Sequence, residues 1–210
     1  MPSDSAERAG DAWRVRVASD AGERELHARL VLNAAGPWIN QVRERIAPRP
    51  PGFEVELVAG THLELPGPLE RGIYYVEAPR DGRAVFAIPW KGRTLVGTTE
   101  TRYAGDPASV SPTREEVEYL RATYAAYFPA RPTEVLDAWA GLRVLPRGSG
   151  AAFDRPRETT LVVDDERRPT TLAIYGGKLT GYRATAAKVV ERLRGSLPPR
   201  ELRRVGLALA

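Results

Sequence analysis

Apolar and polar residues alternate along the first part of the chain in the manner of β-strands. Residues 13–18, Trp-Arg-Val-Arg-Val-Ala, alternate strictly and predict a half-buried strand. After a turn at 20–22, residues 24–32 predict a second strand, which becomes wholly apolar at its end and so enters a buried sheet. A short helix is predicted to begin within 38–46, whereas residues 1–12 are polar and predict a disordered lead-in.

The middle of the chain predicts an antiparallel sheet with one helix packed against it. Residues 48–52, Pro-Arg-Pro-Pro-Gly, indicate a stiff linker. Beyond this linker, short apolar runs separated by Gly or Pro turns predict strands at 53–58, 62–65, 72–77, 84–88 and 94–97. Thr113 and Glu116 have the spacing of a capping box, which begins a helix that Pro129 ends.

The last third of the chain predicts strands that lead into one clear helix. Strands are expected at 137–145, 160–163 and 171–175, with a long polar loop at 146–158. Residues 178–193 then carry apolar positions on one helical face. Many short strands with few helices favour an α+β fold.

The composition restricts the chemistry more than the fold. With 42% hydrophobic residues, the 210-residue chain can build a core, and its net charge of +4 suits an anionic ligand or membrane surface as well as a solvated exterior. Because the chain has no cysteine and two histidines, disulfides, thiolate catalysis and multi-histidine metal sites are excluded. Its arginines are scattered without interleaved aromatic residues, which argues against nucleic-acid binding.

The sequence gives no sign of membrane insertion or export. No apolar run approaches the roughly 18 residues that a membrane-spanning helix requires. The N-terminus is polar and acidic and has no signal-peptide pattern. We therefore expect a cytoplasmic protein, with peripheral contact on the inner face of the membrane left open.

Residues 171–180, Thr-Leu-Ala-Ile-Tyr-Gly-Gly-Lys-Leu-Thr, carry the most informative pattern. A buried strand runs through two glycines directly into a helix, whose first N–H groups lack partners within the helix and attract negative charge. A flavin placed there would have its N1–C2=O edge stabilised on reduction, and Lys178 could add a positive charge. The alternative is a common glycine-rich turn with a lysine that faces solvent.

Three further residues could bind or react with a substrate. His62 follows a glycine at a strand start and could be an acid–base group, although a lone histidine is more often a structural hydrogen-bonding group. Arg143 has apolar neighbours, so its guanidinium needs an anionic partner, either a ligand or a carboxylate. Arg157 lies in a charged loop, where a solvated surface arginine is the default interpretation.

Two apparent nucleotide-binding motifs fail on their residue types. In residues 148–153, Gly-Ser-Gly-Ala-Ala-Phe, phenylalanine replaces the third glycine of a dinucleotide fingerprint, and no βαβ unit surrounds the segment. Gly177-Lys178 is followed by Leu179, where a Walker A motif needs Ser or Thr to bind magnesium. The chain therefore contains no complete nucleotide-binding fingerprint.

Six segments, spread over about residues 13–194, carry a family resemblance when they are taken in order. They are Val31-Leu-Asn-Ala-Ala-Gly-Pro-Trp38, Ala59-Gly-Thr-His62, Phe86-Ala-Ile-Pro-Trp90, Thr94-Leu-Val-Gly-Thr-Thr99, Gly141-Leu-Arg-Val-Leu-Pro146 and Tyr175-Gly-Gly-Lys-Leu-Thr180 with Tyr182-Arg183. Together they resemble the FAD-dependent, aerobic-type glycerol-3-phosphate dehydrogenases of the D-amino-acid-oxidase-like flavoprotein superfamily. The first segment is shared widely in that superfamily, whereas the Gly-Lys-Leu-Thr, Gly-Thr-His and Gly-Thr-Thr segments are more specific.

The resemblance implies a split architecture. Residues 13–47 and 158–195 would form a partial, Rossmann-like FAD-binding domain, and residues 53–147 a substrate-binding cap with an antiparallel or mixed sheet. Residues 196–210 would be a basic tail. The family reaction oxidises the C2 hydroxyl of glycerol 3-phosphate to dihydroxyacetone phosphate, with hydride transfer to FAD and electrons passing on to a membrane quinone.

The resemblance also assigns roles to residues of this sequence. Catalytic roles would fall to His62, Arg143 and Lys178, and substrate binding to Arg143, Lys178 and Arg157. Contacts to FAD, mostly through the backbone, would come from Ala35, Gly36, Gly177, Leu179 and Thr180. A bidentate arginine suits a phosphate dianion, which supports Arg143 without the family argument.

The sequence departs from the family pattern in two respects. The N-terminal Gly-x-Gly-x-x-Gly unit is absent, and Gly181 stands where the family commonly has threonine. We therefore expect a truncated gene, a fragment or a remnant that alone binds FAD weakly and turns over nothing, and that a separate N-terminal FAD-binding chain could complement. The alternatives are a related flavin oxidase of another hydroxy acid or amine, and a non-catalytic module that binds a phosphorylated metabolite or a protein.

Overall fold

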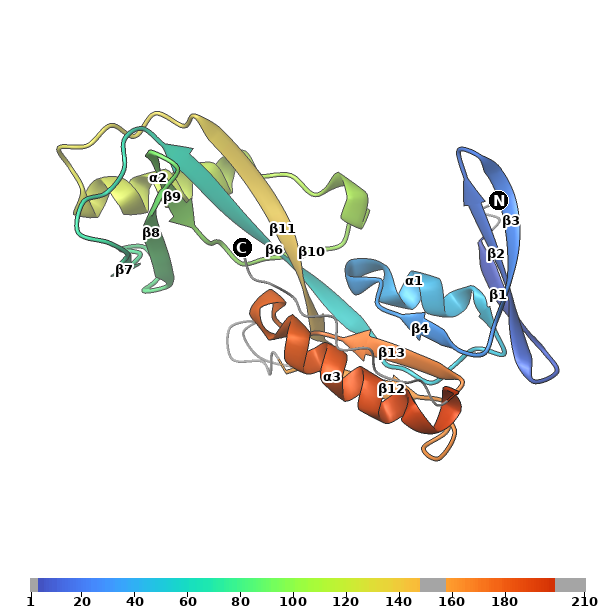
Figure 1. The fold of residues 1–210 in the computed structure, drawn as a ribbon. Coiled ribbons are helices and arrows are strands. Elements are labelled where there is room, and N and C mark those ends of the chain that lie inside the picture. Colours follow the sequence, from blue (N-terminus) through green and yellow to red (C-terminus); the bar gives the residue numbers. More distant parts are fainter. Residues whose placement is uncertain (1–3, 148–157, 199–210) are drawn as a thin grey trace. The chain divides into compact units, whose positions relative to one another are not determined.

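A computed structural model describes residues 4–147 and 158–198 and divides the chain into two compact units (Figure 1). Met1–Phe53 and Glu158–Ala210 together make the first, which we call the discontinuous unit. Glu54–Arg157 make the second, the central unit. The predicted α+β class is confirmed, because each unit combines sheets with few helices.

The first sheet of the discontinuous unit is a meander of three antiparallel strands with one short parallel addition. Its order is β3-β2-β1-β5, formed by β1 (Ser5–Ala9), β2 (Ala12–Ser19), β3 (Gly22–Ala28) and β5 (Ile46–Ala47). The prediction of disorder over residues 1–12 is wrong for Ser5–Ala9. Ala6 is buried beside Trp13 and Ile46. One small apolar residue is too weak a pattern to predict a strand, because β1 forms through its pairing with β2.

The second sheet of this unit has three strands in the order β12-β13-β4. They are β4 (Val31–Asn33), β12 (Thr160–Val163) and β13 (Thr171–Tyr175), with β13 parallel to β4 and antiparallel to β12. The single strand predicted over 24–32 is therefore two strands in different sheets. The main chain leaves the first sheet after Ala28, and Val31 N–H then donates to the Thr170 carbonyl.

A short helical segment follows each of the two parallel strands. After β4 come a 3₁₀ turn, η1 (Gly36–Trp38), and α1 (Ile39–Glu44). After β13 come η4 (Leu179–Gly181) and α3 (Tyr182–Leu193), whose Val189 and Leu193 pack on Val163 and Leu172. The helix predicted to begin at residue 178 thus begins at Tyr182, because Gly176 and Gly177 have positive φ and Lys178 is extended.

The central unit is a six-stranded antiparallel sheet. Its order is β10-β6-β9-β8-β7, with β11 on the free side of β6; the strands are β6 (Val55–Leu65), β7 (Tyr74–Glu77), β8 (Ala84–Trp90), β9 (Arg93–Gly97), β10 (Thr101–Tyr103) and β11 (Asp137–Pro146). The two strands predicted at 53–58 and 62–65 are one. Gly60 does not interrupt β6, because the ten-residue β11 pairs with β6 on both sides of Gly60 and places Gly141 opposite it.

Helix α2 (Arg114–Tyr127) covers one face of this sheet (Figure 1). The predicted capping box is confirmed: the Thr113 hydroxyl accepts from Glu116 N–H, and the Glu116 carboxylate accepts from Thr113 N–H. Leu120 and Tyr124 then pack on the buried sheet residues, which are Leu63, Leu65, Val76, Val85, Ala87 and Val96. Among the described residues, no helix combines the length and apolar content that crossing a bilayer requires.

This packing predicts a large loss of stability on truncation of Leu63, which is fully buried beneath α2. Leu63→Ala should lower the free energy of unfolding by about 2–5 kcal/mol, because it removes apolar contacts and leaves a cavity. Leu136→Ala, a matched change at a residue that is 45% exposed in the same unit, should cost about 0.5 kcal/mol. Urea unfolding followed by circular dichroism measures both, and equal losses would contradict the packing described.

Candidate functional site

The face of the central sheet opposite α2 carries a row of aromatic residues around His62. Directly paired residues on neighbouring strands point to the same face. The row across β11, β6, β9, β8 and β7 is Trp139, His62, Gly97, Phe86 and Tyr75. Trp139, Phe86 and Tyr75 are exposed, at 43%, 42% and 60%, so this face is open and available to a ligand.

Trp139 and Gly97, the residues on either side of His62 in this row, fix the position of the imidazole ring. The imidazole stacks on Trp139 with ring centroids 4.4 Å apart and an angle of 16° between the planes. On the other side lies Gly97, where a Cβ would stand 2.3 Å from His62 Cδ2. Only glycine at position 97 therefore lets the imidazole lie across β9.

The surroundings of His62 favour its neutral form. Burial lowers the pKa of His62 below its ordinary 6.5, and the positive charge of Arg143 lowers it further, whereas the Gly60 carbonyl acts in the opposite sense. The buried Nδ1 makes no hydrogen bond of normal geometry to any residue that the structure describes. A neutral imidazole at physiological pH can accept a proton, so the environment is compatible with the predicted acid–base role.

Arg143 lies on the same face as His62, four residues beyond Trp139 on β11. Its Nη1 donates to the Thr99 carbonyl at 3.3 Å, and its Nη2 donates to Thr98 Oγ1 at 3.2 Å. The guanidinium passes over Gly60, where a Cβ would stand 2.9 Å from Nη1. The structure thus brings His62 and Arg143 together on one face. The sequence alone could not predict this, because the two residues lie on different strands.

A carboxylate also stands near Arg143, as the alternative interpretation of that residue anticipated. Arg143 Nη1 is 3.8 Å from Glu100 Oε1, whereas Arg83 Nη2 is 2.5 Å from Glu100 Oε2. Arg83 is therefore the closer counter-ion of Glu100. The Arg143 side chain is 25% exposed.

The residues predicted to contact FAD gather at one edge of the three-stranded sheet in the discontinuous unit. Ala35 and Gly36 follow β4, whereas Gly177, Leu179 and Thr180 follow β13. Because these two strands are adjacent and parallel, their carboxyl ends meet at the same edge, where open α/β sheets bind ligands. Lys178 also lies at this edge, in the discontinuous unit, and not on the face that carries His62 and Arg143.

The turns at this edge leave backbone donors and apolar surface available. Gly36 and Gly177 have φ of 53° and 94°, and within the described part of the chain neither η4 nor α3 has a side-chain cap on its first N–H groups. Leu179 is 89% exposed and Tyr182 is 63% exposed. Gly181, the N-cap of α3, has no hydroxyl with which to cap the helix. Uncapped N–H groups beside apolar surface fit the polar edge and the flat ring of a flavin.

Sequence reasoning missed several residues that organise these sites. Buried Asn33 fixes the turn after β4, since its amide donates to the Ile39 carbonyl and its oxygen accepts from Ala35 N–H. Trp139 falls within the strand predicted at 137–145, but its contact with His62 depends on strand register. Thr98 and Thr99, which lie in one of the resemblance segments but have no predicted role, hold Arg143. Arg157 lies outside the described residues.

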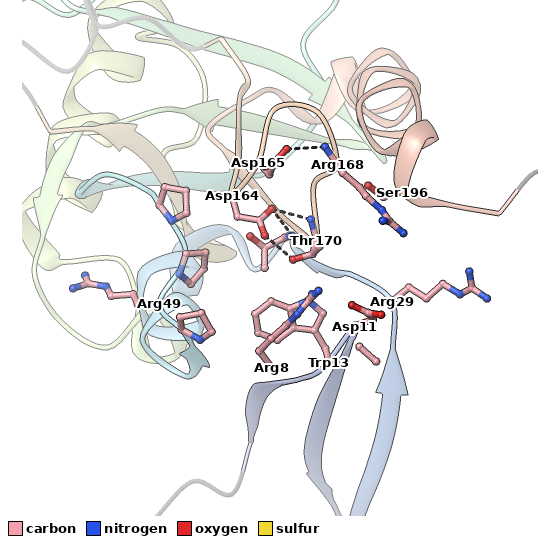
Figure 2. A pocket seen from close by; sticks show the side chains of 15 residues that line it. Arg8, Asp11, Trp13, Arg29, Arg49, Asp164, Asp165, Arg168, Thr170 and Ser196 are labelled. Atoms are coloured by element: carbon pink, nitrogen blue, oxygen red, sulfur yellow. Dashed lines mark hydrogen bonds between the residues drawn. The ribbon is translucent and has the colours of Figure 1, made fainter.

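A separate cavity of about 760 Å³ lies at the opposite edge of the same small sheet (Figure 2). Thr170 and Thr171 at the start of β13 line it, together with Asp164, while Arg8 and Trp13 form the facing wall. Burial alone would raise the pKa of Asp164, but hydrogen bonds from the Thr170 hydroxyl and the Thr171 and Thr170 backbones outweigh it and lower the pKa. These contacts give Asp164 a role in the β12–β13 turn. None of the predicted site residues that the structure describes lines this cavity.

Comparison with known proteins agrees with the predicted flavoprotein family. The family model described as FAD dependent oxidoreductase matches residues 2–183. Glycerol-3-phosphate dehydrogenase of Pseudomonas aeruginosa is 33% identical over 90% of this chain and 38% of its own length. D-erythritol 1-phosphate dehydrogenase of Brucella abortus is 32% identical over 94% of this chain and 40% of its own length. The chain thus spans about two fifths of these curated relatives.

Solved structures show the same relationship. Glycerol-3-phosphate dehydrogenase from Bacillus halodurans, complexed with FAD, has a TM-score of 0.77 and 31% identity over 96% of this chain and 40% of that one. L-alpha-glycerophosphate oxidase from Mycoplasma pneumoniae, with FAD bound, has a TM-score of 0.66 and 17% identity over 93% of this chain and 50% of that one, which shows the fold alone. Since the family model matches most of its length, the chain belongs to the FAD dependent oxidoreductase family.

Proposed function

We propose that this chain forms the substrate-binding part and the flavin-edge part of an enzyme that oxidises glycerol 3-phosphate to dihydroxyacetone phosphate. The observation that carries the proposal is that a neutral His62 and Arg143 lie together on one open face of the sheet. A cation and a proton acceptor in one site suit the oxidation of an alcohol that carries a phosphate. Two glycerol-3-phosphate dehydrogenases that are similar to this chain support that substrate.

FAD would be held at the carboxyl ends of β4 and β13. The uncapped N–H groups near Gly177, Leu179 and Thr180 would face its polar edge, and Ala35 and Gly36 would let it approach the backbone after β4. When bound, FAD supplies the two-electron acceptor of the reaction. Lys178 would place a positive charge close to the flavin and the substrate.

Arg143 and His62 would divide the work on the substrate. The guanidinium of Arg143 donates through its two terminal nitrogens to Thr98 and Thr99, which fixes its orientation, and this planar cation would bind the phosphate dianion. Lys178 and Arg157 would add charge toward the same group. His62 would take the proton of the C2 hydroxyl as the carbon is oxidised, and its neutral state leaves it free to do so.

A second polyol phosphate is favoured by one observation. The Brucella abortus relative, at 32% identity, is named D-erythritol 1-phosphate dehydrogenase. Glycerol 3-phosphate and D-erythritol 1-phosphate share a phosphate and a secondary alcohol, so the same Arg143 and His62 roles would serve either one. The open aromatic row leaves room for a longer carbon chain. A direct comparison of the two substrates would decide between them.

The proposal includes a partner that supplies the rest of the FAD site. The sequence has no Gly-x-Gly-x-x-Gly fingerprint, which in this fold class holds the pyrophosphate. β4 is an edge strand of its sheet, so its outer side can pair with a further parallel strand. A separate FAD-binding chain would fit that edge. Transfer of electrons onward to a quinone, at the inner face of the membrane, completes the proposed reaction.

We expect the chain alone to bind FAD weakly, through the flavin edge only. Lys178→Ala should weaken that binding by up to about fivefold, the effect of removing about 1 kcal/mol of charge interaction at an exposed position. Lys188→Ala, a change of the same charge at another exposed position of the same unit, should have no effect. A titration that follows the visible flavin absorbance measures all three affinities.

The same titration tests the proposal as a whole. Addition of glycerol 3-phosphate should bleach the flavin when an FAD-binding chain with the dinucleotide fingerprint is also present. Stoichiometric FAD in the purified chain would contradict weak binding. A complemented preparation that binds FAD, yet bleaches with neither polyol phosphate, would rule out the proposed substrates and favour an oxidase of a different alcohol or amine.

The state of His62 gives a further prediction. An imidazole NMR titration should place its midpoint below 6.5. Arg143→Gln should raise that midpoint, because the charge of Arg143 is one of the two causes that lower the pKa of His62. Arg121→Gln, on the exposed side of α2, should leave it unchanged. Because the unfolded chain protonates His62 near 6.5 and the folded chain below it, His62 should make stability fall as pH falls through this window. A midpoint above 6.5 would contradict the site as described.

A further inference from the structure

Glu116 is a buried carboxylate that the proposed reaction does not use. It is the third residue of α2 and is only 7% exposed. The capping box accounts for one of its contacts, the bond that it accepts from Thr113 N–H at 3.1 Å. The remaining contacts join α2 to the sheet beneath it.

Three threonine hydroxyls donate to this carboxylate. Thr61 on β6 donates to Oε2 at 2.9 Å, while Thr99 and Thr101 donate to Oε1 at 2.9 Å and 2.7 Å. Since a carboxylate can only accept, the Thr99 hydroxyl must direct its proton to Glu116, which leaves its lone pairs to accept from Thr61 N–H at 2.9 Å. Thr99 is therefore fixed in position and in hydrogen-bond direction.

Thr99 connects this cluster to the open face of the sheet. Its carbonyl accepts from Arg143 Nη1 at 3.3 Å and from the Thr98 hydroxyl at 3.1 Å. Because the Thr98 proton is engaged there, Thr98 Oγ1 accepts from Arg143 Nη2 at 3.2 Å. Thr99 and Thr98 thus accept from Nη1 and Nη2 of the guanidinium, and the Glu116 carboxylate on the opposite face of the sheet holds Thr99 in place.

We propose that Glu116 is a positioning residue for the anion-binding guanidinium of Arg143, acting through Thr99 from the opposite face of the sheet. The inference rests on the proposed function, in which Arg143 binds the phosphate of a polyol phosphate. It assigns α2 a second role beside covering the core. The negative charge of Glu116 matters because one neutral amide cannot accept from four donors.

Two substitutions test this relay, with a matched control. Glu116→Gln keeps the shape but turns one oxygen into a donor, and Thr99→Val removes the hydroxyl while leaving the carboxylate. Each should shift and broaden the ¹⁵N signal of the Arg143 side chain. Each should also weaken the binding of glycerol 3-phosphate by roughly tenfold. Glu115→Gln changes the neighbouring residue in the same helical turn, whose side chain is 80% exposed, and should alter neither the Arg143 signal nor the affinity. Thr99→Ser keeps the hydroxyl and should give the wild-type signal and affinity.

A pH series separates positioning from a general loss of stability. Burial alone would raise the pKa of Glu116, but the bonds from Thr101, Thr113, Thr61 and Thr99 outweigh it, so the pKa lies below its ordinary 4.5. As pH falls through that lowered value, the wild-type Arg143 signal should move toward its position in Glu116→Gln. Glu100, which faces Arg143 and Arg83, and His62, which faces Arg143, are present in both proteins, so the difference between the two pH series isolates Glu116.

The outcomes distinguish the relay from the reaction. If both variants lower the melting temperature yet leave the Arg143 signal and ligand affinity unchanged, Glu116 is structural only and the inference is overturned. If wild-type protein binds no glycerol 3-phosphate while the Arg143 signal still depends on Glu116, the positioning is supported and the proposed substrate fails. Weakened binding of inorganic phosphate together with glycerol 3-phosphate would place the effect at the phosphate, as expected.

Discussion

The central unit depends on one long hydrogen-bonded ladder between β6 and β11. Ten residue pairs run from Asp137 opposite Glu64 to Pro146 opposite Val55. Because side chains alternate along a strand, this register sends Leu63 toward α2 and puts His62 and Arg143 on the other face. A slip of one residue would exchange the two faces, so the ladder that builds the core also builds the candidate site.

Glycines make that ladder chemically useful. At Gly97 and Gly60 the absence of a side chain lets His62 and Arg143 lie across neighbouring strands, where a Cβ would meet their rings or guanidinium nitrogens at 2.3 Å and 2.9 Å. Glycine ordinarily weakens a strand. Here the cost is offset by pairing along the whole length of β6 and by the Glu116 cluster, which ties β6 to α2. The site therefore relies on the helix behind it.

The sequence predicted individual elements better than their junctions. The capping box at Thr113 and most central strands could be recognised from local spacing, and the glycine-rich turn after Tyr175 from its residue types. The continuity of β6 through Gly60 and the strand at Ser5–Ala9 could not, because pairing partners distant in sequence decide both. The contact of His62 with Trp139 depends on register alone. The capping role of Glu116 could be predicted from its spacing to Thr113. Its bonds to Thr61, Thr99 and Thr101 could not, because these residues come from three separate strands or turns.

The coupling between Arg143 and His62 has a consequence for the proposed reaction. In the free protein the positive charge of Arg143 adds to burial and lowers the pKa of His62, which keeps the imidazole neutral but makes it a weaker base. A phosphate dianion bound to Arg143 would compensate that charge and so raise the basicity of His62. The base would thus become stronger when a substrate is in place, and an alcohol without a phosphate would lack this effect. Discrimination for phosphorylated substrates would then arise in the proton transfer as well as in binding.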